Sequence, residues 1–73
     1  MTGDLQQTFG ENLRRYRQAR GINQEDFAEL LGVHRTYVGS IERGERNLSL
    51  GRVEELAARL DADPLTLLTP PER

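Results

Sequence analysis

The segment from residue 32 to residue 47, GVHRTYVGSIERGERN, gathers side chains that form strong hydrogen bonds. Its spacing predicts a short helix whose polar face carries Arg35, Thr36, Tyr37, Ser40 and Arg43, with Gly39 in the middle. An arginine fork matches paired acceptor atoms, and a hydroxyl can donate to or accept from a single polar atom. Glycine inside a helix costs roughly 1 kcal/mol relative to alanine. This face is therefore suited to contact a polar partner, and the glycine at its centre requires a reason.

The same chain offers no catalytic or metal chemistry. It has one histidine, His34, and no cysteine, so neither a nucleophile–base pair nor a cluster of metal ligands can be assembled. Glu54 and Glu55 are adjacent on a predicted helix and point about 100° apart, which excludes a catalytic pair of carboxylates. We expect a protein that is not an enzyme and that uses no cofactor and no metal.

Length and charge limit the class of protein. The chain has 73 residues, enough for a single domain, and a formal net charge of −2. All ten basic residues are arginine, and they are segregated: residues 11–20 hold four arginines against one acid, residues 34–52 four against two, and residues 53–73 two against five. One part of the surface can thus be positive although the whole chain is acidic. Without an apolar run of membrane-spanning length or a secretory signal, we expect a cytoplasmic, nucleoid-associated protein.

Capping residues and apolar periodicity predict an all-α fold of five helices. The first helix is expected to begin after Thr8, whose hydroxyl forms a capping box with Glu11, and to end at Gly21. The others are expected from Asn23 to Gly32, over residues 35–43 before Gly44, after the Ser49 cap, and over the short LTLL segment that follows Asp63 and Pro64. Residues 8–69 would form the core, with residues 1–7 and 70–73 flexible. The inner stripe of the fourth helix is predicted to contain Leu50, Val53, Leu56, Ala57 and Leu60.

The second and third predicted helices have the spacing of a helix-turn-helix. Counted from Gln24 as the first position, positions 4, 8, 10, 15 and 18 are all apolar: Phe27, Leu31, Val33, Val38 and Ile41. Position 5 is the small Ala28, which lets the helices approach, and position 9 is Gly32, where the turn needs a positive φ. Seven positions therefore satisfy three separate physical requirements.

On these residues, the stretch NQEDFAELLGVHRTYVGSIERGERNLSL resembles the Cro/cI-type (XRE-like) helix-turn-helix family, which has the lambda repressor-like DNA-binding fold. The resemblance covers about residues 9–68, and HRTY…SIERGERN is most similar to the controller proteins of restriction–modification systems. It implies a small transcriptional regulator that binds a pseudo-palindromic operator in double-stranded DNA as a homodimer and acts by occupancy, with no small-molecule effector.

The resemblance also implies roles for individual residues. The third helix would lie in the major groove. Base edges would be contacted by Arg35, Thr36 and Ser40, with Gly39 allowing the helix to sit deep in the groove. Phosphates would be contacted by Asn23, Gln24, His34, Tyr37, Arg43, Arg46 and Asn47. Arg17 and Glu42 would form a structural ion pair, and Leu65, Leu67 and Leu68 would contribute to the dimer interface, with Leu67 the exposed member.

Other interpretations remain open at the level of sequence. Gly39 can be incidental on an exposed face, and His34 can be a solvated turn residue rather than a phosphate contact. The protein can be a monomer with one exposed leucine. It can also be an antitoxin-type or other protein-interaction module, which the acidic second and fourth helices would favour.

Overall fold

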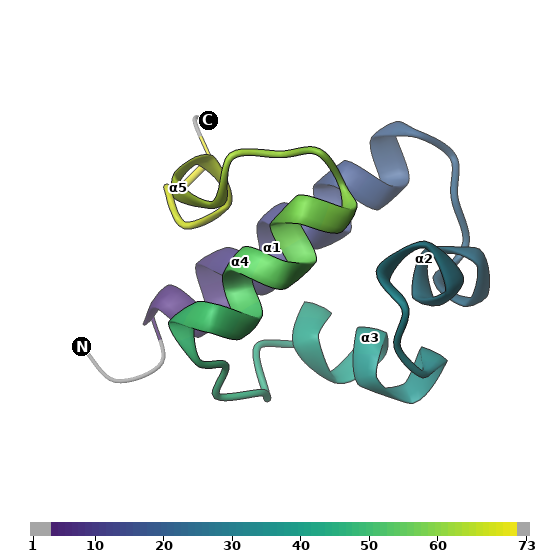
Figure 1. The fold of residues 1–73 in the computed structure, drawn as a ribbon, viewed down its shortest axis with the longest axis horizontal. Helices are drawn as coiled ribbons and strands as arrows, with labels where there is room; N and C mark the ends of the chain where they lie inside the picture. The colour runs from purple at the N-terminus through teal and green to yellow at the C-terminus, as the bar shows by residue number, and fades with distance from the viewer. Residues whose placement is uncertain (1–3, 72–73) are drawn as a thin grey trace.

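The computed structural model describes residues 4–71, which form five helices joined by short loops (Figure 1). The helices are α1 (Asp4–Ala19), α2 (Gln24–Leu31), α3 (Arg35–Glu42), α4 (Leu50–Arg59) and α5 (Pro64–Leu67). These residues contain no strand, so the all-α prediction is confirmed. None of the helices in this part of the chain combines the length and the apolarity that crossing a membrane requires.

Most helix ends lie where the capping residues placed them. Four side chains accept a hydrogen bond from a backbone N–H in the first turn of a helix, those of Asn23, His34, Ser49 and Asp63. The three glycines expected to end α1, α2 and α3 all have positive φ: 65° at Gly21, 74° at Gly32 and 76° at Gly44. After α4 the left-handed residue is Asp61, with φ of 53°, which the sequence did not indicate.

The start of α1 was predicted wrongly. The helix begins at Asp4 rather than after Thr8, so residues 4–7 form its first turn instead of a flexible leader. Asp4 places a negative charge in the first turn, where the helix dipole favours it. The side-chain amide of Gln6 donates to the carbonyl oxygen of Gly44 at 3.1 Å and ties this turn to the end of α3. Residues 1–3 and 72–73 lie outside the described part of the chain.

The helix-turn-helix is formed by α2 and α3, which pack directly against each other. Phe27, Leu31, Val38 and Ile41 are buried, as predicted, and Val33 is half-buried against them. Ala28 is also buried, which is consistent with its role as the small residue between the helices. In Figure 1, α3 lies along one edge of the molecule beside α2, and α5 lies on the opposite side.

A close approach of α1 to α3 holds the helix-turn-helix on the rest of the domain. Gly10 is buried in the middle of α1, and a Cβ atom at this position would collide with the backbone carbonyl oxygen of Ile41. It would also lie 3.1 Å from the carbonyl oxygen of Glu42. Only glycine therefore allows the two helix backbones to come this close. Phe9 and Leu13 flank this contact and are buried in the core.

The C-terminal helices differ from the predictions at two leucines. Val53, Leu56, Ala57 and Leu60 line the core, but Leu50, at the first position of α4, is 77% exposed.

In α5 the exposed leucine is Leu65, at 71%, whereas Leu67 is buried, so the expectation that Leu67 is the exposed one is wrong. The reason is that Asn12 of α1 donates to the carbonyl oxygens of Leu67 and Thr69, at 2.7 and 2.8 Å. These bonds fix the end of α5 against α1 with Leu67 inward.

Candidate functional site

The first turn of α3 presents its polar side chains to solvent. The His34 ring caps the helix, because its Nδ1 accepts a hydrogen bond from the backbone N–H of Thr36 at 3.1 Å. An accepting Nδ1 leaves Nε2 to carry the ring proton. Arg35 and Thr36 are exposed, and within residues 4–71 neither side chain forms a hydrogen bond or an ion pair. Both side chains are thus available to an external partner.

Ser40 does not belong to this exposed face. It is only 7% exposed, and its hydroxyl donates to the carbonyl oxygen of Tyr37 at 2.8 Å. The same oxygen accepts from Nε of Arg46 at 2.9 Å. The expectation that Ser40 lies on the exposed polar face with Thr36 is therefore wrong. It lies on the inner side of α3, where it connects the helix to the segment that follows it.

Gly39 is also not open to solvent, contrary to the expectation of a bare groove-facing position. It is buried under two long polar side chains. A Cβ atom at this position would lie 3.2 Å from Nη1 of Arg43 and 3.9 Å from the amide atoms of Gln24. These neighbours are side-chain ends rather than backbone. The glycine therefore provides room on the helix surface for the Arg43 guanidinium.

Beside α3, three residues form a cluster of one aromatic ring and two cations. The Arg46 guanidinium lies 4.9 Å from the centroid of the Tyr37 ring, and that of Arg52 lies 5.4 Å from it. Arg52 also donates from Nε to the Tyr37 hydroxyl at 3.5 Å and from Nη1 to Glu55 at 3.3 Å. The bond to Tyr37, followed by the bond to Glu55, raises the pKa of Arg52. This cluster holds positive charge next to α3.

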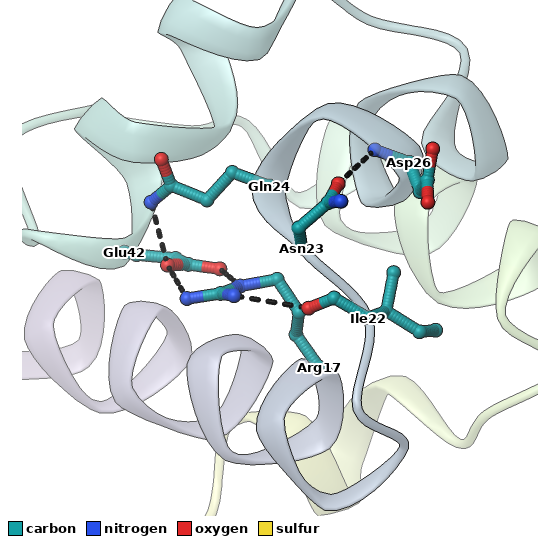
Figure 2. A network of polar contacts seen from close by, with 6 residues as sticks. All are labelled: Arg17, Ile22, Asn23, Gln24, Asp26 and Glu42. Atoms are coloured by element: carbon teal, nitrogen blue, oxygen red, sulfur yellow. Dashed lines mark hydrogen bonds and ion pairs between the residues drawn. The ribbon is translucent and has the colours of Figure 1, made fainter.

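Beneath the site, the ion pair expected between Arg17 and Glu42 is present (Figure 2). Arg17 donates to the two carboxylate oxygens of Glu42 from Nε at 2.7 Å and from Nη2 at 3.0 Å. Its Nη1 donates to the carbonyl oxygen of Ile22, between α1 and α2, at 3.0 Å. The Glu42 side chain is only 4% exposed. One guanidinium therefore joins α1, the loop before α2, and the end of α3.

The two residues at the start of α2 are partly committed to internal contacts. Gln24 donates from Nε2 to Glu42 at 3.1 Å, so its amide nitrogen is directed into the ion pair rather than outward (Figure 2). Asn23 accepts the backbone N–H of Asp26 at 2.8 Å through Oδ1. Asn23 remains exposed and keeps its Nδ2 donors, whereas Gln24 is half-buried.

The remaining predicted residues lie on the segment after α3. Arg43, Arg46 and Asn47 are all exposed. Arg43 forms a two-pronged ion pair with Glu45, and Asn47 lies near the start of α4. Sequence reasoning missed Arg52, because its contact with Tyr37 joins residues 15 positions apart and no local pattern marks it. It also missed Glu45, although the two-residue spacing from Arg43 in ERGER was visible. Among residues 4–71 no group of three or more potential metal-ligating side chains is present.

Proteins of similar sequence and structure also contain a helix-turn-helix. The helix-turn-helix family model matches residues 13–67. Control protein C.SmaI of Serratia marcescens is 44% identical over 66 residues, covering 90% of this chain and 79% of the relative. Control protein C.BamHI of Bacillus amyloliquefaciens is 38% identical over 69 residues, covering 93% and 85%.

Two solved structures extend the comparison. The restriction-modification controller protein C.AhdI from Aeromonas hydrophila is similar with a TM-score of 0.74 and 47% identity, over 85% of this chain and 94% of that one. The hypothetical transcription factor NHTF from Neisseria gives a TM-score of 0.83 at 38% identity, over 93% and 78%. With its matching fold, its helix-turn-helix and an exposed polar face on α3, the chain belongs to the helix-turn-helix family of DNA-binding transcriptional regulators, with restriction–modification controller proteins among its relatives.

Proposed function

We propose that this protein is a controller-type regulator that binds a two-fold symmetric operator as a homodimer and regulates transcription by occupying it. The observation that carries this proposal is the first turn of α3, where Arg35 and Thr36 are exposed and their side chains form no hydrogen bond or ion pair within residues 4–71. A side chain that contacts base edges must be exposed and must not already be held by hydrogen bonds within the protein. The Arg17–Glu42 ion pair and the Gly10 contact fix the helix behind them.

Base recognition is assigned to two residues. Arg35 can donate two parallel hydrogen bonds to O6 and N7 of guanine, and Thr36 can contact a thymine methyl group or a phosphate. Ser40 is removed from this set because its hydroxyl is used internally. Gly39 acts indirectly, by leaving room for Arg43. Two contacts per half-site are few, which is why a dimer with two half-sites about one helical turn apart is expected.

Phosphate contacts are assigned to the residues that surround this turn. Asn23 and the first backbone N–H groups of α2 lie at a helix N-terminus, which favours an anion. His34 can donate from Nε2 while its Nδ1 caps α3. Tyr37, Arg43, Arg46 and Asn47 complete the set, and Arg52 joins it through its contact with Tyr37. Gln24 supports Glu42 instead, and its backbone rather than its amide nitrogen would face a phosphate.

The dimer interface is assigned to the apolar surface around the start of α4. Leu5 and Leu50 are exposed leucines, and both line a groove with Leu48, Val53 and Leu68. Leu65 is the exposed member of α5, whereas the buried Leu67 is excluded. Burying such leucines is favourable by about 1.5–3 kcal/mol each when complete. Leu50→Asp and Leu65→Asp should each weaken the dimer in sedimentation equilibrium without unfolding the chain, and unchanged association would place the interface elsewhere.

The experiment that tests the function is selection of binding sites from random double-stranded DNA at near-physiological salt. A single enriched site with two-fold symmetry is the expected result. Enrichment of a non-symmetric half-site would indicate a monomer. Failure to enrich any site, together with co-purification of a basic protein partner, would favour a protein-interaction module and refute the proposal.

A further inference from the structure

The surface of α3 carries a second arginine whose situation is unlike that of Arg35. The Arg43 guanidinium lies across Gly39, with Nη1 3.2 Å from the position that a Cβ atom would take. On its other edge, Nε and Nη2 donate to the two carboxylate oxygens of Glu45 at 3.0 and 3.1 Å. The guanidinium is thus laid along the helix by a residue two positions later in the chain.

Glu45 contributes little to folding in this arrangement. Both side chains of the pair are more than half exposed, at 61% for Arg43 and 58% for Glu45. Water screens the attraction within an exposed pair, so such a pair adds little to the stability of the fold. Each partner favours the charged form of the other, since the Arg43 hydrogen bond lowers the pKa of the Glu45 carboxyl and the Glu45 bond raises the pKa of Arg43. The main effect of the pair is therefore on the availability of the Arg43 cation.

That availability matters for discrimination between DNA sequences. Binding to arbitrary DNA depends on how many phosphates the protein neutralises, because each releases condensed counterions. An arginine already paired with a carboxylate neutralises no phosphate until the pair opens, and the carboxylate itself repels the backbone. At the operator, the base contacts of Arg35 and Thr36 offset the free energy needed to open the Arg43–Glu45 pair. On arbitrary DNA these base contacts are not formed, so the pair stays closed.

We propose that Glu45 is a specificity-determining residue that acts through Arg43. It holds the guanidinium over Gly39 and withholds it from the phosphates of arbitrary DNA. Arg43 is released to the backbone only when the remaining contacts of the site are made. This role rests on the proposed function, since it requires that α3 meets DNA.

The test compares Glu45→Gln with Glu11→Gln, a matched control. Both substitutions remove one negative charge from an arginine–glutamate pair with exposed side chains, but Glu11 pairs with Arg15, which is not among the assigned phosphate contacts. Binding of each variant to the selected operator and to a scrambled duplex is measured over a range of salt concentrations. For the scrambled duplex, Glu45→Gln should steepen the slope of log K against log salt by about 0.9. If the variant and the wild type bind the scrambled duplex equally at 1 M salt, this change of slope makes the variant bind about fivefold more tightly at 0.15 M salt. Operator affinity should rise less, so the specificity ratio falls.

Further variants assign the effect. Adding Arg43→Gln to Glu45→Gln should remove the gain in slope, because no cation is left to release. The proposal is overturned if Glu11→Gln gives the same gain, which would make it an effect of net charge, or if the gain persists without Arg43. If the wild type binds its operator but Glu45→Gln leaves the salt slope on scrambled DNA unchanged, only the role of Glu45 is refuted. A wild type that binds no DNA refutes the proposed function as well.

Discussion

The ion pair beneath α3 gives the sharpest stability prediction. Replacing Arg17 by Met keeps most of the side-chain volume but removes its charge and its three hydrogen bonds, two to Glu42 and one to Ile22. The Glu42 carboxylate, 4% exposed, would keep only the bond from Gln24. A buried carboxylate that loses its partner costs about 3–5 kcal/mol. A domain of 73 residues is stable by only about 4–11 kcal/mol in total, so this loss is a large fraction of the whole.

The assay is urea unfolding followed by far-ultraviolet circular dichroism. With an m-value of about 1–3 kcal/mol per molar urea, Arg17→Met should lower the midpoint by about 1 M or more. Arg15→Met is the matched control, because Arg15 lies in the same helix and forms an exposed pair with Glu11 at 3.7 Å. Its cost should stay below about 1 kcal/mol. The double variant Arg17→Met, Glu42→Leu should recover most of the loss, since no buried charge is then left alone. Equal losses of stability in Arg17→Met and Arg15→Met would show that the buried Arg17–Glu42 pair contributes no more to the fold than the exposed Arg15–Glu11 pair.

Three further predictions follow from the same structure. Gly10→Ala should destabilise the fold by about 1–3 kcal/mol, because the added Cβ forces α1 away from the α3 backbone. At Gly51 an added Cβ would lie 4.0 Å from Ser49 Oγ, so Gly51→Ala should stabilise the fold by about 0.4–1 kcal/mol. Thermal unfolding should show the midpoint temperature falling in Gly10→Ala and rising in Gly51→Ala. His34→Ala should lower the free energy of unfolding by about 0.5–2 kcal/mol through loss of the α3 cap, and His34→Asn should keep the stability of the wild type. Equal losses of stability in both variants would show that the His34 ring does not stabilise α3 as a cap. The hydrogen bond from Arg43 lowers the pKa of Glu45, so the stabilising contribution of the pair should be present at neutral pH and lost as the pH falls through that lowered pKa. Carbon-detected NMR titration should show the midpoint of the Glu45 titration moving upward in Arg43→Gln. An unchanged midpoint would mean that the pair does not form in solution.

Local signals in the sequence were sufficient for most of the fold. Caps and left-handed glycines act within one helical turn, so the boundaries at Asn23, Gly32 and Ser49 could be predicted without knowledge of the tertiary structure. The Thr8 capping box failed for the opposite reason. The contact of Gln6 with Gly44, 38 residues away, supports an earlier start of α1, and no local pattern reveals it.

The candidate site was predicted less completely than the fold. Arg35 and Thr36 are exposed on α3, as expected, because they lie in its first turn. Ser40 was misplaced because helical periodicity alone does not show that Arg46 folds back to bond its hydroxyl. Leu67 was predicted to be the exposed leucine of this helix, whereas Leu65 is exposed, because a single turn has too few residues to define an apolar face. Asn12, 55 residues from Leu67, decides which side of α5 faces the core.

In the proposed function, α3 recognises the DNA sequence through Arg35. The most direct test is the affinity of the wild type and of Arg35→Ala for the selected operator and for operators changed at one base pair in each half-site. Arg35→Ala should lose about 1–3 kcal/mol of binding free energy per contact on the operator and should no longer distinguish the bases at one position of each half-site. A uniform loss on every duplex, with base discrimination intact, would contradict this prediction and reduce Arg35 to a phosphate contact.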